Sequence, residues 1–268
     1  MKKNLILHVG LQKTAASFLK EEVFSKIKNI DIIDYKKNPK LKSKYKKILI
    51  SDETLSGELF SNEKKIRSKK FKNLAKVKII LVLRNQKDYL LSAYYFLVSK
   101  GVVFRTFDFW LKKNSSQKLI NKLKFTNYIN FYQKEFGKQN LLVLFYEDLL
   151  NNKDLFFSNM SKFIGEKIPT VKNKKVNYSI KSNFHLVLLI INFVNIYFFL
   201  FFKKVKLLND KSFSFLVTRI SRFYYSIFRD KKKTNNHKIN IPFMNEIVAD
   251  NIKLKKMLKK LPTNYKIK

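Results

Sequence analysis

The sequence lacks cysteine altogether and contains only 5 glycines, 4 prolines and 3 histidines. Without cysteine the chain can form no disulfide and no thiolate metal site, and nothing points to an oxidising compartment. The histidines, His8, His185 and His237, are too scattered to suggest a zinc site. We therefore expect no metal, and a fold held by an apolar core, for which the 46% of hydrophobic residues suffice.

Acidic residues are also few, since 57 Lys and Arg stand against 19 Asp and Glu and give a formal net charge of +38. Such an excess suits nucleic acid or an anionic membrane surface. The excess is mostly lysine, however, and a coding bias toward lysine, asparagine and isoleucine would coat any protein surface in the same way. Arginine, whose fork matches guanine, is scarce, so we expect no specific binding of nucleic acid.

The N-terminal apolar stretch, in "MKKNLILHVGLQKT", is too short for a signal peptide and runs directly into Gln12 and Lys13. We therefore expect the protein in the cytoplasm. Its 268 residues fit one domain better than two. We predict a single domain over residues 1–268, with an α/β core at 1–170 and a helical, partly apolar extension at 171–268.

Apolar segments that do not alternate with polar residues are separated by helical patterns along the first 150 residues. This arrangement predicts a parallel sheet with helices on both faces, a three-layer α/β/α fold of the P-loop kind. Ligands in such folds bind at the carboxyl ends of the strands, where Lys13, Glu53 and Arg84 fall. The predicted strands are 4–10, 30–33, 47–53, 77–84 and the start of 140–150, and the predicted helices are 17–27 and 86–100.

A long apolar run, residues 186–202, begins beyond the predicted core and is interrupted by Asn192 and Asn195. It is marginal for a membrane-spanning helix, which needs about 20 apolar residues. Three interpretations stay open: a span, a helix lying on the membrane surface, and internal or oligomer packing. Flanking lysines and tyrosines suit an interface, so peripheral contact with the inner membrane through residues 186–228 is one expectation.

The segment "GLQKTAAS", Gly10 to Ser17, has the frame of a phosphate-binding loop between a strand and a helix. Ala16 stands where such a loop carries its lysine, which disfavours a magnesium–ATP site, and Lys13 lies three residues earlier. Backbone N–H groups of such a loop can hold an anion without side chains. A strand–turn–helix without a ligand is the alternative, and Ala15 in place of the usual glycine favours it.

Together with the segments "LRNQKDYLLSAYY" and "LISDETLSG", this loop resembles the PAPS-dependent sulfotransferases, in particular bacterial members and the carbohydrate or Golgi-type branch. The family patterns are G-x-x-K-T-G-T-[TS], R-N-P-x-D-R-x-x-S-x-Y and S-x-E-x-L-S. The segments "YEDLL", "VNYSIK" and the C-terminal "VADNIKLKKMLKKLPTNY" also match bacterial members. Ala15, Ala16, Gln86 and Tyr89 depart from the patterns, and the two alanines remove one hydroxyl contact and some backbone freedom from the loop.

The resemblance implies that PAPS is the co-substrate and that no metal is needed. It places the 5′-phosphosulfate on the loop, with Lys13 also stabilising charge on the leaving phosphate. It places the 3′-phosphate on Arg84 and Ser92 and makes Glu53 the general base, with Asp52 as the rival. The residues it assigns to binding are Gly10, Lys13, Thr14, Ala15, Ala16, Ser17, Arg84 and Ser92, together with Asn177 and Ser179 of the segment "VNYSIK".

The predicted function is therefore sulfonate transfer from PAPS to a hydroxyl or amine of a carbohydrate, or of a cell-envelope glycan or glycolipid. Three alternatives are a P-loop kinase or other nucleotide-binding protein, a basic protein that binds membrane or nucleic acid without catalysis, and a family member that has lost activity. No motif identifies the acceptor.

Overall fold

The computed structural model describes residues 4–34, 41–56, 67–73, 76–169, 179–180, 189–190, 192–194, 197, 229–230 and 241–265. Contacts divide the chain into two compact units. The first comprises Met1–Gln86, Ser116–Val176 and Phe243–Lys268, and the second comprises Lys87–Ser115 and Asn177–Pro242. The C-terminal part of the predicted extension thus belongs to the first unit. The single-domain organisation remains a prediction.

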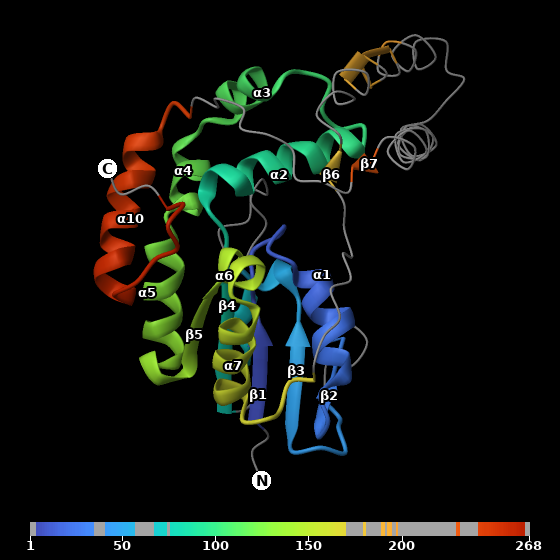
Figure 1. Ribbon diagram of the computed structural model, residues 1–268, viewed down its shortest axis with the longest axis vertical. Helices are drawn as coiled ribbons and strands as arrows, with labels where there is room; N and C mark the ends of the chain where they lie inside the picture. Colours follow the sequence, from blue (N-terminus) through green and yellow to red (C-terminus); the bar gives the residue numbers. More distant parts are fainter. Residues whose placement is uncertain are drawn as a thin grey trace. The chain divides into compact units, whose positions relative to one another are not determined.

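The first unit is built on a five-stranded sheet in which every described pairing is parallel (Figure 1). The strand order is β2-β3-β1-β4-β5. The strands are β1 (Asn4–His8), β2 (Ile30–Ile32), β3 (Lys47–Ser51), β4 (Lys76–Leu83) and β5 (Leu141–Phe145). This arrangement confirms the predicted parallel sheet and all five predicted strands within a few residues at their ends.

One face of the sheet is covered by the helical segment after β1 and by α7 (Lys153–Ile164). The predicted helix 17–27 is composite: α1 (Ala16–Phe18) continues as a π-helical turn, η1 (Leu19–Val23), and a 3-10 turn, η2 (Phe24–Lys26). Its apolar residues pack with alternate strand residues such as Ile6, Leu49 and Ile80 in one core cluster. Helix α6 (Tyr146–Asn151) links β5 to α7.

The alternate apolar residues of the three central strands are buried as well and point to the opposite face of the sheet; they are Leu5, Leu7, Ile48, Ile50, Ile79 and Leu81. Helix α5 (Phe125–Phe136) contacts β4 and β5, and α4 (Gln117–Leu123) and α10 (Met244–Leu258) pack against α5. The 3-10 turns η3 (Glu53–Ser56) and η4 (Arg67–Phe71) contact each other, and a third, η5 (Lys138–Asn140), precedes β5. The flanking helices confirm the predicted α/β class.

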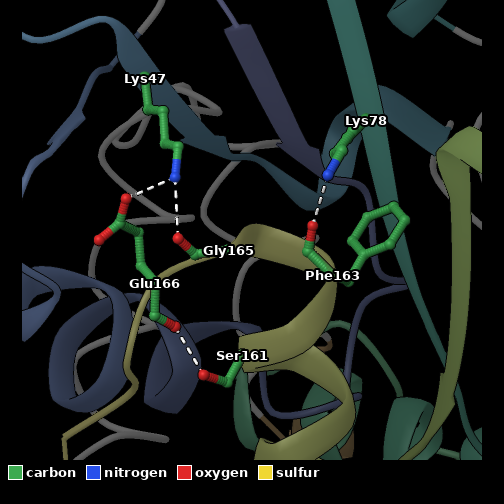
Figure 2. Close-up of polar contacts among 6 residues, drawn as sticks. All are labelled: Lys47, Lys78, Ser161, Phe163, Gly165 and Glu166. Carbon is green, nitrogen blue, oxygen red and sulfur yellow. Dashed lines mark hydrogen bonds and ion pairs between the residues drawn. The ribbon is translucent and has the colours of Figure 1, made fainter.

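Two lysines from the sheet hold the C-terminal end of α7 (Figure 2). Lys78 of β4 donates to the carbonyl oxygen of Phe163 at 2.7 Å. Lys47 of β3 donates to the carbonyl oxygen of Gly165 at 2.9 Å and forms an ion pair with Glu166. Cations suit a helix C-terminus because they satisfy its last carbonyl groups and complement its dipole. These contacts lie near the amino ends of the strands, away from the predicted ligand site.

The second unit contains α2, which begins at Gln86 and ends at Ser99, α3 (Phe107–Asn114) and a short antiparallel pair, β6 (Ser179–Ile180) with β7 (Arg229–Asp230). Tyr94 lies against Phe107 and Trp110 in its core. Asn192 donates to the carbonyl oxygens of Val98 and Val103, at 2.9 Å each. No helix in the described ranges is long and apolar enough to cross a membrane, and most of the run 186–202 lies outside those ranges.

Candidate functional site

The loop after β1 alternates between left- and right-handed backbone. Lys13 and Ala15 have φ angles of 65° and 68°, whereas Thr14 between them and Ala16 after them keep negative φ. Such alternation turns successive backbone N–H groups toward one side and makes an anion-binding concavity, called a nest. The loop therefore has the backbone geometry of such a nest although alanine occupies the usual glycine position.

Glycine is required at the first position of this loop for a different reason. A Cβ atom on Gly10 would lie 3.0 Å from both Nε2 of His8 and Oγ1 of Thr14, closer than side chains normally approach. Thr14 is fully buried, and its hydroxyl donates to the carbonyl oxygen of Leu11 at 2.5 Å. The side chain of Thr14 thus fixes the turn from inside the protein.

His8, the last residue of β1, is completely buried beneath the loop. Its Nδ1 atom lies 2.8 Å from the hydroxyl oxygen of Ser51 on β3, and its ring meets Phe24 edge to face at 5.2 Å. Its Nε2 atom has no hydrogen-bond partner among the residues that the structure describes. Burial lowers the pKa of His8 to about 4, so the imidazole is neutral at physiological pH.

Arg84, directly after β4, joins the loop to the neighbouring strand end. Its Nη1 atom donates to the carbonyl oxygen of Lys13 at 2.9 Å, and its guanidinium lies over the ring of Tyr146 at 4.7 Å. Its Nε atom is buried and makes no hydrogen bond within the described part of the chain. The structure thus brings Arg84 and Lys13 together and places a charged guanidinium beside the loop.

The end of β3 is fastened to the end of β1 by several polar contacts. The N–H of Asp52 donates to the carbonyl oxygen of His8 at 3.2 Å, and the Ser56 hydroxyl donates to the carbonyl oxygen of Val9. Asp52 also accepts from the N–H and the hydroxyl of Thr54, at 2.8 and 2.7 Å. Asp52 is therefore occupied as the cap of η3, and Glu53, half-buried, is the next carboxylate at this edge.

The remaining predicted site residues are placed as follows. In the loop, Ala16 is buried at the start of α1 and Ser17 is exposed. Ser92 lies half-buried on α2 in the second unit, Ser179 lies in β6, and Asn177 lies outside the described residues. Among the residues that are described, no three His, Asp or Glu side chains form a group that could hold a metal ion.

The structure also points to residues that the sequence did not single out. Tyr146 supports the Arg84 guanidinium, and Glu147 accepts the N–H of Asn85 at 2.9 Å. Both belong to the quoted segment "YEDLL", so the signal was present as a motif match without a physical role. Glu147 is buried at this strand end and ties the chain after β5 to the chain after β4.

Comparison with known proteins identifies the family of the chain. A model of the sulfotransferase domain matches residues 4–185, and the chain therefore belongs to the sulfotransferase family. No curated protein matches the chain. The fold is similar to that of a sulfotransferase from Alicyclobacillus acidocaldarius, with 14% identity and a TM-score of 0.50 over 66% of this chain and 87% of that chain. Mouse sulfotransferase SULT7A1 complexed with PAP aligns with 16% identity and a TM-score of 0.37, over 63% of this chain and 61% of that chain.

Family membership confirms the predicted activity class, a sulfotransferase, and PAPS as the sulfonate donor. It agrees with the loop geometry, because a nest of N–H groups with a lysine and an arginine beside it suits a nucleotide that carries a phosphosulfate and a phosphate.

Proposed function

We propose that the protein transfers the sulfonate group of PAPS to a hydroxyl or amine of a carbohydrate, carried by a cell-envelope glycan or glycolipid. On this proposal it is a bacterial member of the carbohydrate or Golgi-type branch. The observation that carries the proposal is the hydrogen bond from Arg84 to the carbonyl oxygen of Lys13. Arg84 and Lys13 therefore lie next to each other, and they are the residues predicted to bind the 3′-phosphate and the 5′-phosphosulfate of the nucleotide.

The loop would hold the 5′-phosphosulfate mainly through its backbone. The alternating φ angles of residues 13–16 support this role, and Gly10 lets the loop lie close over His8 and Thr14. PAPS supplies an activated sulfonate whose leaving group is a phosphate. Lys13 would stabilise the negative charge that develops there, since a preorganised cation lowers the barrier most where charge forms.

Arg84 would hold the 3′-phosphate. Its guanidinium is oriented by Tyr146 and by the carbonyl oxygen of Lys13, which leaves the remaining donors for an anion. The hydrogen bond to Lys13 is accepted by a backbone carbonyl, which has no formal charge. This contact therefore leaves the positive charge of the guanidinium uncompensated. Ser92, Asn177 and Ser179 complete the proposed nucleotide contacts on the basis of the sequence resemblance.

Glu53 would take the proton from the acceptor hydroxyl or amine. Its position supports this role, because it follows β3 where Asp52 and Ser56 tie that strand to β1 and the loop. Asp52, the alternative general base, accepts two hydrogen bonds from Thr54 and therefore acts as a capping residue. A positioned general base contributes about 10²- to 10⁴-fold to the rate.

A thermal-shift titration tests the nucleotide assignment. The purified protein is titrated with PAP, which lacks the sulfonate, and separately with magnesium–ATP, each at two salt concentrations. A ligand at 100 times its Kd stabilises the folded state by about 2.7 kcal/mol, which is easily detected. We expect a shift with PAP that Arg84→Ala abolishes, and a much smaller one with magnesium–ATP.

Lys78→Ala is the matched control for Arg84→Ala. Lys78 lies in β4 and Arg84 directly follows that strand, about 20 Å further along at the rise of an extended chain. Each carries one positive charge, but Lys78 binds the end of α7 (Figure 2). It should leave the PAP shift unchanged. A PAP shift that both variants reduce equally would show a response to net charge alone, and a dominant shift with magnesium–ATP would favour the kinase alternative.

From the proposed acceptor we infer that the protein is cytoplasmic and makes peripheral contact with the inner membrane through residues 186–228. Four described residues of that region, Ile190, Phe193, Val194 and Tyr197, are exposed large apolar side chains. Apolar side chains beside abundant lysine suit an anionic bilayer. Sedimentation with vesicles rich in phosphatidylglycerol should retain the protein, and recovery of all protein in the supernatant, at low salt, would end this part of the proposal.

A further inference from the structure

The C-terminal segment, residues 243–265, contains the family-like pattern "VADN…NY", to which the proposed reaction assigns no role. In the structure it reaches the strand ends that carry the site. Asn251 of α10 accepts a hydrogen bond from the side-chain nitrogen of Gln86 at 2.8 Å. The carbonyl oxygen of Asn264 accepts one from the side chain of Asn85, also at 2.8 Å.

Asn85 and Gln86 directly follow Arg84, so the C-terminal segment holds the two residues next to the proposed 3′-phosphate ligand. Both are buried, as is Asn251. Buried hydrogen bonds of this kind are costly to break, because a partner that is left unsatisfied loses its solvation without compensation. The backbone after Arg84 is therefore fixed from the C-terminal side.

Three consecutive residues at the end of β5 contact either this stretch or the C-terminal segment that holds it. Phe145 meets the buried ring of Tyr265 edge to face at 5.2 Å, Tyr146 lies against the Arg84 guanidinium, and Glu147 accepts the N–H of Asn85. Segments more than 60 residues apart in the sequence thus converge on the chain immediately after β4. Helix α10 has a second anchor as well.

That other anchor is Asp250, the neighbour of Asn251. Its carboxylate accepts from the N–H and the hydroxyl of Thr126 at the start of α5 and so caps that helix from outside. Asp250 is buried, and burial raises its pKa although Thr126 opposes the shift. Adjacent residues of α10 thus have separate tasks: Asp250 stabilises the helical layer, and Asn251 reaches the site.

We propose that the C-terminal segment is a brace that positions Arg84 for the 3′-phosphate, through Asn85 and Gln86. These two residues and Asn251 are positioning residues, since they act through Arg84. The proposal rests on the proposed function, in which Arg84 binds the 3′-phosphate. It predicts that loosening the brace weakens recognition of the 3′-phosphate selectively, without weakening the rest of the nucleotide site.

The test compares the Kd of PAP with that of adenosine 5′-monophosphate, which differs from PAP only in lacking the 3′-phosphate. The variants are Asn85→Ala and the double substitution Gln86→Met with Asn251→Leu, which replaces both hydrogen-bonding partners by apolar groups of similar size and so spares the fold. Each should lower the preference for PAP roughly fivefold, within the range of coupling found inside one hydrogen-bond network. The Kd of adenosine 5′-monophosphate should stay within twofold of the original value.

Asp250→Asn is the matched control, one residue away on the same helix. It weakens the cap of α5 and should lower the melting temperature without changing the preference for PAP. Brace variants that behave like Asp250→Asn, or that weaken both nucleotides equally, would show that the segment only stabilises the fold. Adding Asn85→Ala to Arg84→Ala should cause no further loss of preference, because the brace acts through the arginine.

The variant Arg84→Ala tests the assignment of Arg84 to the 3′-phosphate separately from the brace. If it loses the preference for PAP while the brace variants keep it, the brace is refuted and the assignment of Arg84 stands. If the unaltered protein shows no preference for PAP, or if Arg84→Ala retains it, the assignment of Arg84 fails and the brace fails with it.

Discussion

Ala15 is the residue whose substitution best tests the geometry of the phosphate loop. Its φ of 68° and ψ of 24° are left-handed, and this conformation costs an L-amino acid about 1–2 kcal/mol because Cβ crowds the carbonyl oxygen. Ala15→Gly removes this cost but makes the unfolded chain more flexible, which offsets about 0.4–1 kcal/mol. The net expectation is stabilisation by roughly 0.5–1 kcal/mol, or about 1–4 °C in melting temperature for a chain of this size.

Thermal unfolding by calorimetry or circular dichroism measures this difference, with Ala16→Gly as the control. Ala16 is the next residue, buried and helical, so glycine there should destabilise the protein by about 0.5–1 kcal/mol. The same substitution at neighbouring positions should therefore have opposite signs. Equal destabilisation by both would refute the left-handed conformation at residue 15, and with it the argument for a backbone nest.

The remaining predictions concern four other side chains at or beneath the site. Lys13→Ala should lower turnover by more than it weakens PAP, because PAP lacks the sulfonate; equal losses in kinetics and calorimetric binding would move Lys13 to a purely binding role. Glu53→Gln should bind PAPS normally and slow transfer about 10²-fold or more, whereas Asp52→Asn should mainly lower stability; a steady-state assay with unchanged kcat for Glu53→Gln would assign the base elsewhere. Burial lowers the pKa of His8 from 6.5 to about 4, so the unfolded chain binds a proton at this residue between these pH values and the folded chain does not. The free energy of unfolding should therefore fall by roughly 3 kcal/mol as the pH drops through this window, and denaturant titrations should show a weaker pH dependence for His8→Gln. A variant with the original pH dependence would show that His8 is already charged or exposed in the folded protein.

The strands could be predicted from the sequence because their signal is local. Uninterrupted apolar runs, as in Val77–Leu83, place a strand in the interior of a parallel sheet whatever the rest of the chain does. The helices between residues 107 and 136 were not predicted, although the buried residues Phe125, Tyr128, Ile129 and Tyr132 of α5 follow the helical spacing i, i+3, i+4, i+7. Alanine also gives no local sign of a left-handed backbone, so the conformation of Ala15 could not be foreseen.

In the candidate site, the positions of residues along the strands could be predicted, but the contacts between them could not. Lys13, Arg84 and Glu53 could be placed at one edge of the sheet because each follows a predicted strand. The contacts that orient them could not be predicted, since Asn85 bonds residues 62 and 179 positions away. Gln86 illustrates the limit well: it departs from the proline of the family pattern, and its hydrogen bond to Asn251 emerges only from the fold.

The π-helical turn Leu19–Val23 marks a place where the chain can change in length. Its buried residues Leu19, Val23, Phe24 and Ile27 are spaced i, i+4, i+5, i+8, which is one residue more than an α-helix with the same buried face needs. Loss of one of the exposed residues, Lys20 or Glu21, would convert the spacing to i, i+3, i+4, i+7 and leave an ordinary α-helix. The deletion of one residue at this point can therefore be absorbed within a single turn, while the loop before it keeps both its sequence and its contacts.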